Sequence, residues 1–142
     1  MTGRTDTRRT AVDLLDDVAA GMRTRAEAVL RSHGLSYDAW RVLQSLAADG
    51  PQPMRQLRES TRITGPTLTR VVDRLAETAL VYRNVDAADR RRVVVHLSDR
   101  GRAVHETLRP DLARLEQEAL APLSADEAAL LEELLERIVP GG

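Results

Sequence analysis

The spacing of apolar residues changes its period twice along the chain. From Ala11 up to Ala79 apolar side chains recur every three or four positions, which is typical of amphipathic helices. Between Leu80 and Leu97 the period becomes two, as in short β-strands, and the polar tract 84–91 predicts a hairpin loop. The helical period then returns for the rest of the chain. These changes predict a mainly helical protein with one small β-hairpin.

Capping and turn residues divide the helical segments. Gly34 ends the first helix, because glycine tolerates the left-handed conformation that follows a helix, and Ser36 is a favoured N-cap for the second. Ser124 and Glu127 form a capping box for the last helix. The expected helices cover 11–30, 36–49, 54–60, 66–79, 98–120 and 124–138, and the expected strands cover 80–83 and 92–97.

Length and composition exclude several classes of protein. The 142 residues suit one compact domain with helical extensions. No charge-free stretch exceeds seven residues, whereas a transmembrane helix needs roughly 20 apolar residues. Three aspartates between positions 13 and 17 also interrupt the apolar core that a signal peptide would need. We therefore expect a cytoplasmic protein without a membrane partner. The absence of cysteine excludes disulfides, thiolate zinc sites and thiol redox sensors.

Positive charge gathers in the middle of the chain. Residues 54–102 contain eleven arginines and six acids, whereas 1–53 are neutral and 103–142 contain three arginines and nine acids. All 21 basic residues are arginine, which we attribute to the codon bias of GC-rich DNA. A basic block inside a chain of net charge −1 indicates that one face meets a polyanion. The scarcity of aromatic residues argues against a base-stacking platform for single strands.

The helices over 54–60 and 66–79 are joined by a tight turn, and with the hairpin they predict a winged helix-turn-helix. The outer face of the second helix carries small polar and basic residues near its N-terminus, as a recognition helix in the major groove requires. These residues are Pro66, Thr67, Thr69, Arg70 and Arg74. Arg70 is the candidate for a bidentate contact with guanine, and the threonines are candidates for phosphate contacts. A merely solvated helix face is the competing interpretation, and this helix alone does not decide between them.

The expected hairpin tip contains Asp89-Arg90-Arg91-Arg92. Three adjacent arginines repel one another unless an anion is near, and the narrow minor groove of DNA is strongly negative. We therefore expect Arg91 to enter the minor groove, Asp89 to hold it in place and Arg90 to contact phosphate. The alternative is that the arginines pair with nearby aspartates and only solubilise the hairpin. We favour DNA because the helix and the hairpin indicate the same partner.

The first and last helices carry apolar stripes that a small winged domain is too short to cover. A second copy of the chain could cover them, so we expect a two-fold homodimer. The expected division is an N-terminal dimerisation helix over 1–34, a winged helix-turn-helix over 35–98 and C-terminal dimerisation helices over 99–142.

Several runs in this order resemble the MarR (multiple antibiotic resistance regulator) family over residues 35–102. The runs are Trp40-Arg-Val-Leu, Pro66-Thr-Leu-Thr-Arg-Val-Val-Asp-Arg-Leu, Leu80-Val-Tyr-Arg, Asp89-Arg-Arg and Val95-His-Leu-Ser-Asp-Arg-Gly. The resemblance implies a dimeric repressor that binds a pseudo-palindromic operator in double-stranded DNA and is released by a small ligand, often a phenolic or other aromatic acid. Matching positions imply DNA contacts by Thr67, Thr69, Arg70, Arg74 and Arg91, the last oriented through Asp89.

The resemblance also places a ligand pocket between the dimerisation helices and the winged domain. Residues expected near it are His33, Tyr37, Trp40 and Arg41. Each has a simpler interpretation: Trp40 as a core residue, Tyr37 as its half-buried neighbour and His33 as a helix-end residue. The chain departs from the family's pattern at Arg58, where alanine is usual, and at Ala79, where glycine is usual. Arg58 could add a phosphate contact, and Ala79 removes a favourable helix cap.

An enzyme and a protein-interaction module are the alternatives to a DNA-binding regulator. An enzyme would need a phosphate-binding glycine loop, a nucleophile elbow or a framed carboxylate pair, and the sequence has none of these, so we expect no catalytic residues and no cofactor. Three scattered histidines do not predict a metal site. A winged-helix protein-interaction module would present a neutral or acidic outer face, whereas this face is basic.

Overall fold

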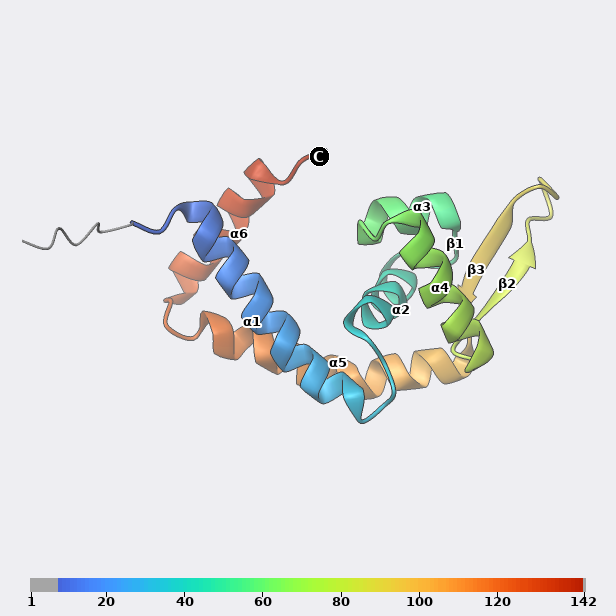
Figure 1. The fold of residues 1–142 in the computed structure, drawn as a ribbon, viewed down its shortest axis with the longest axis horizontal. Coiled ribbons are helices and arrows are strands. Elements are labelled where there is room, and N and C mark those ends of the chain that lie inside the picture. Colours follow the sequence, from blue (N-terminus) through green and yellow to red (C-terminus); the bar gives the residue numbers. More distant parts are fainter. Residues whose placement is uncertain (1–7, 142) are drawn as a thin grey trace, which may run out of the picture.

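The computed structural model describes residues 8–141 and confirms a mainly helical winged helix-turn-helix (Figure 1). Its order matches the predicted one, apart from an added short strand. The elements are α1 (Ala11–Arg31), α2 (Tyr37–Asp49), β1 (Gln52–Pro53), α3 (Met54–Thr61), α4 (Gly65–Glu77), β2 (Val81–Val85), β3 (Val93–Leu97), α5 (Asp99–Leu120) and α6 (Ala125–Ile138).

The elements form a winged unit and a helical arm. Helices α2, α3 and α4 and the three-stranded antiparallel sheet, of order β1-β3-β2, make the winged unit, from which the β2–β3 hairpin projects (Figure 1). Helix α5 starts directly after the hairpin and runs back to α1, and α6 lies at the far end of the arm (Figure 1). The recognition helix and the wing are therefore held at one end of an elongated molecule.

Strand β1 was not predicted from the sequence, because a strand of two residues is too short to show an alternation of apolar and polar side chains. Its residue Gln52 pairs with Val95 of β3 and is fully buried. The Gln52 side-chain amide donates to the carbonyls of Ser45, at 3.0 Å, and Gly50, at 3.2 Å, while its carbonyl oxygen accepts from Ser60 at 3.2 Å. A buried polar side chain is tolerated when it is hydrogen-bonded in this way. The amide thus joins α2, β1 and α3 within the winged unit.

The end of α4 and the start of β2 differ from those predicted for a single physical reason. Helix α4 ends at Glu77 rather than at Ala79, because Ala79 adopts the left-handed conformation (φ 61°) that terminates a helix. The amide of Leu80 then donates to the carbonyl of Leu75 at 2.9 Å, and the strand begins at Val81. Ala79 therefore occupies the cap position that favours glycine, in agreement with the expectation drawn from this departure.

The hydrophobic core lies in the winged unit and at its junction with the arm. Helix α2 buries five residues, whereas α1 buries only Ala26 and Leu30 near its C-terminal end, and α6 buries none. Large apolar side chains on these outer helices remain exposed, namely Val12, Leu14, Leu15, Val18, Leu130, Leu134 and Ile138. None of the helices within residues 8–141 is long and apolar enough to cross a membrane.

Capping boxes begin both outer helices. Thr10 accepts from the amide of Asp13, whose carboxylate accepts from the amide of Thr10, and Ser124 and Glu127 repeat this exchange at α6. Hydrogen bonds from the capping residue lower the pKa of Asp13 and of Glu127, because they favour the charged carboxylates. The predicted capping box of α6 is confirmed.

The start of α5 passes close to the end of α4. A Cβ at Gly101 would lie 2.0 Å from the carbonyl oxygen of Leu80 and 2.8 Å from Cδ1 of Leu97. We expect Gly101→Ala to lower the free energy of unfolding by about 3 kcal/mol, because the backbone must shift to accept the methyl group. Urea denaturation measures this change. Gly21→Ala on α1 is the matched control: its Cβ would meet nothing within 4 Å, and we expect it to add roughly 0.5–1 kcal/mol. Equal stability of Gly101→Ala and the parent would contradict the close approach.

Candidate DNA-binding interface

Helix α4 buries one face and exposes the other, as the periodicity predicted. Leu68, Val72 and Leu75 pack into the core of the winged unit. The opposite face carries exposed polar and charged residues, with Thr67 half-buried at its edge; the exposed set is Pro66, Thr69, Arg70, Asp73, Arg74 and Glu77. The apolar face therefore fixes the helix while its basic side remains open to a partner.

The arginines of α4 are available for a new contact. Arg70 Nη2 makes one long hydrogen bond, donated to Thr67 Oγ1 at 3.4 Å. Within the described part of the chain, neither Arg70 nor Arg74 forms an ion pair with an acid. The Thr69 hydroxyl donates to the carbonyl of Gly65 at 3.0 Å. Two guanidinium groups thus lie on the exposed side of the helix without a competing carboxylate.

Asp73 on the same face has a different role. Its carboxylate accepts a hydrogen bond from Arg83 of β2, so a salt bridge joins the recognition helix to the wing. Because Arg83 neutralises Asp73, the acid adds no unpaired charge to the basic face. Sequence reasoning missed this pair, since a helix-to-strand contact has no fixed spacing along the chain.

Aspartates fold the backbone of the hairpin tip. Asp86 accepts from the amide of Ala88 at 2.9 Å, and Asp89 accepts from the amide of Arg91 at 3.0 Å. The Asp89 side chain therefore contacts the backbone amide of Arg91 rather than the Arg91 guanidinium group. Exposed at the tip, Arg90, Arg91 and Arg92 form no ion pair within residues 8–141, so the proposed pairing with aspartates finds no support in the geometry.

The residues predicted near a ligand pocket lie in two places. Tyr37, Trp40 and Arg41 line a cavity of about 310 Å³ between α2 and α3. Arg41 donates to the carbonyl of Thr61, at the end of α3. His33 is separate from them. It is exposed beyond the end of α1, and its Nδ1 lies 3.1 Å from Oγ of the preceding residue, Ser32.

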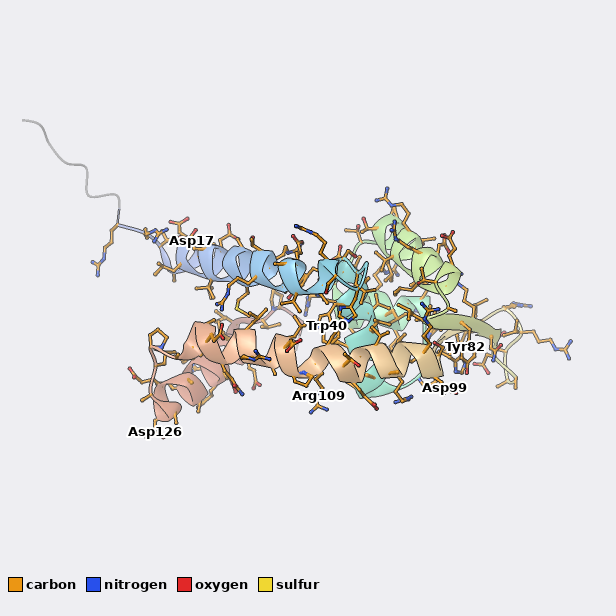
Figure 2. The ribbon with its side chains drawn as sticks, turned by 90° about the horizontal axis from the view of Figure 1, so that it is seen from below. Asp17, Trp40, Tyr82, Asp99, Arg109 and Asp126 are labelled. Atoms are coloured by element: carbon orange, nitrogen blue, oxygen red, sulfur yellow. The ribbon has the colours of Figure 1, made fainter. Side chains whose placement is uncertain are left out.

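Trp40 is a core residue, as its simpler interpretation held. It is buried, and its ring stacks on His105 of α5 at 5.0 Å between centroids; Figure 2 labels it inside the fold beside α5. His105 also lies 2.5 Å from Oε1 of Gln44. Burial lowers the pKa of His105, and nearby Arg109 and Arg102 add to this effect while Glu106 opposes it. These effects favour the neutral ring, which joins α2 to α5 as a packing group.

A larger cavity, of about 490 Å³, lies between α1, α2 and α4. Its apolar lining includes Leu35, Ala39, Val71 and Leu75, and its charged lining consists of Glu27, Arg31, Arg70 and Arg74. Sequence reasoning missed this cavity, because it forms only when the end of α1 approaches the side of α4. The cavity shares two arginines with the exposed face of the recognition helix.

No group of three or more histidine or acidic side chains within residues 8–141 could hold a metal ion. The surface instead combines a basic recognition helix with a basic wing, joined by the Asp73–Arg83 salt bridge. A helix of this kind suits the major groove of duplex DNA, and an arginine-tipped hairpin suits the adjacent minor groove. The fold and this surface define a winged-helix DNA-binding protein.

Comparisons with known proteins identify its family. A model of the MarR family matches residues 33–92. YwaE of Bacillus subtilis, an uncharacterized HTH-type transcriptional regulator, is 30% identical over 121 residues, which cover 84% of this chain and 71% of that protein. The homoprotocatechuate degradative operon repressor of Escherichia coli is 24% identical over 114 residues, or 80% and 77% of the two chains.

A solved structure of mutant MarR from Escherichia coli, complexed with operator DNA, agrees in fold. It matches with a TM-score of 0.81 and 28% sequence identity, over 89% of this chain and 91% of that one. The chain therefore belongs to the MarR family, and it is a DNA-binding transcriptional regulator. The resemblance found in the sequence is confirmed.

Proposed function

We propose that the protein is a homodimeric repressor that binds a pseudo-palindromic operator and is released by a small aromatic acid. The observation that carries this proposal is the presence of two sets of arginines, one on α4 and one at the wing tip. Neither set has an ion-pair partner within residues 8–141. The repressor role is supported by the name of the homoprotocatechuate degradative operon repressor. We place the regulator in the cytoplasm and assign it no catalytic activity.

Dimerisation would use the outer helices. Exposed apolar residues on α1 and α6 form faces that the winged unit does not cover, and contiguous apolar surface of this kind marks an interaction site. The division that follows is a dimerisation helix over 1–34, a DNA-binding unit over 35–98 and dimerisation helices over 99–142. A two-fold axis would present two recognition helices to half-sites about one helical turn apart.

The DNA contacts would divide between base reading and phosphate binding. Arg70 would read a guanine edge, because its guanidinium group can make two parallel hydrogen bonds. Pro66, Thr67, Thr69 and Arg74 would flank it on the same helix. Arg91 would enter the minor groove and Arg90 would contact phosphate, with Asp89 shaping the loop through the Arg91 amide.

The effector would bind in the larger cavity rather than beside Trp40 and Arg41, which already have partners inside the protein. An aromatic acid could place its ring on Leu35 and Val71 and its carboxylate among the arginines. A ligand bound there would engage Arg70 and would therefore compete with DNA for the same side chain. The smaller cavity, with Tyr37, is the alternative position.

Fluorescence anisotropy tests the proposal by measuring binding to duplex DNA taken from the intergenic region next to the protein's own coding region. The measurement is repeated in the presence of a panel of aromatic acids. We expect specific binding that one class of acid reverses. Arg31→Ala is expected to raise the acid concentration needed for release about tenfold while leaving operator affinity within twofold, because Arg31 lines the cavity from α1.

Arg25→Ala is the control for this variant, since Arg25 pairs with Glu118 outside the cavity. We expect its release curve to match that of the parent. An Arg31→Ala curve identical to the parent's would move the effector to the smaller cavity, and an absence of specific binding to any duplex would contradict the regulator itself.

A further inference from the structure

The turn of the helix-turn-helix contains a residue in an unfavourable conformation. Arg62, directly after α3, has φ 56° and ψ 23°, the left-handed region in which glycine and asparagine are usual. Within residues 8–141 the only other non-glycine residue with positive φ is Ala79. An outlier of this kind persists when the surrounding structure requires it. At Arg62 this conformation ends α3, and the Arg62 amide donates to the carbonyl of Arg58 at 2.9 Å.

The Arg62 side chain contacts the other end of the molecule. Its Nη2 donates a hydrogen bond to the carbonyl oxygen of Pro140 at 2.5 Å, across a separation of 78 residues. A Cβ at Gly141 would lie 3.9 Å from the same nitrogen, so the guanidinium group rests against the turn that follows α6. In Figure 1 the chain end after α6 returns toward α3.

The contact joins the winged unit to the segment after Leu120, and few other contacts connect these two parts. Among the residues that the structure describes, it is the only hydrogen bond or ion pair between the winged unit and the segment after Leu120. Helix α6 has no fully buried residue, and its half-buried Ala128, Leu131 and Leu135 are not among the residues packed against the main core. The angle between α6 and the winged unit therefore depends on this contact and on the connection through α5.

We propose that Arg62 is a positioning residue that fixes the winged unit relative to α6 through its hydrogen bond to Pro140. The consequence for DNA binding rests on the proposed homodimer. If α6 belongs to the dimer interface, the angle that Arg62 sets also determines the separation of the two recognition helices. That separation must match half-sites one helical turn apart for both subunits to bind together.

Distances between spin labels test the first part of the proposal. The chain has no cysteine, so Gln56→Cys on α3 and Glu132→Cys on α6, both exposed, can carry labels without other changes. Dilution with unlabelled chain restricts the signal to distances within one subunit, whether or not the protein dimerises. We expect a narrow distribution in the parent and a distribution at least twice as wide in Arg62→Gln. Arg58→Gln is the control, because Arg58 is another exposed arginine of α3. We expect it to leave the width unchanged.

Two further variants separate positioning from folding. Deletion of residues 140–142 removes the acceptor and is expected to give the same broadening, with no addition when it is combined with Arg62→Gln. Arg62→Gly removes the guanidinium group but relieves the backbone strain, so it broadens the distribution without lowering the melting temperature. Unchanged widths in Arg62→Gln and in the deletion would overturn the proposal.

Operator binding tests the second part. Arg62→Gln is expected to weaken binding to a two-half-site operator about tenfold and binding to a single half-site less than twofold. Broadened distances with unchanged operator affinity would overturn the connection to half-site spacing and leave the contact as a purely internal support. A chain without DNA affinity, by contrast, would contradict the proposed function and leave the distance result unaffected.

Discussion

Leu134→Glu is expected to convert the dimer into monomers and to weaken operator binding at least a hundredfold. Leu134 lies on α6 with 43% of its surface exposed, between Leu130 and Ile138, which are more exposed still. In the proposed interface a carboxylate at this position would lose its hydration without gaining a partner, which is strongly unfavourable. Two half-sites held by separate monomers also lose the advantage of linkage, which is worth roughly 10²–10⁴ in affinity.

Sedimentation equilibrium and anisotropy measure the two effects of Leu134→Glu. Leu134→Met is the matched control, because a swap of similar volume preserves an apolar interface. Circular dichroism should show an intact fold in both variants, since α6 buries no residue within its own chain. A Leu134→Glu protein that remains dimeric and binds the operator normally would place the dimer interface elsewhere.

Arg70→Ala is expected to weaken operator binding by about 1–3 kcal/mol, or roughly 5- to 150-fold, and to reduce the preference for operator over random DNA. Arg70 is exposed on α4 and has no acidic partner within residues 8–141. Its loss would therefore remove the proposed base contact without disturbing the fold. Arg91→Ala should weaken binding while the dimer and its melting temperature stay unchanged.

Competition titrations with operator and random duplexes measure the effect of Arg70→Ala. Arg55→Ala is the control, because Arg55 lies on α3 and pairs with Glu59. An equal loss on operator and random DNA would show that Arg70 contacts only phosphate, since base contacts carry the sequence preference. Loss of folding in Arg91→Ala would show instead that the wing arginine is structural.

Much of the fold could be predicted because local signals determine it. The helical period located six helices, and Gly34, Ser36 and Ser124 marked ends that the structure confirms. The signals failed where the decisive contact is distant in sequence. Strand β1 exists because Gln52 pairs with Val95, and α4 stops early because Ala79 turns to the left-handed conformation.

The candidate site was predictable in its residues but not in its connections. The exposed face of α4 follows from periodicity, and the arginines at the hairpin tip follow from the sequence alone. The Asp73–Arg83 salt bridge and the Arg62–Pro140 contact join elements without any characteristic spacing, so only the folded chain reveals them. The larger cavity is hidden for the same reason, because α1 and α4 contribute its walls.

We propose that the exposed arginines of α4 and the wing bind the DNA backbone as one surface. The measurement that tests it most directly is the affinity of the purified protein for its operator as a function of salt concentration. Contact with about six to ten phosphates predicts a slope of log affinity against log salt between about −5 and −9. A slope near zero would contradict the claim.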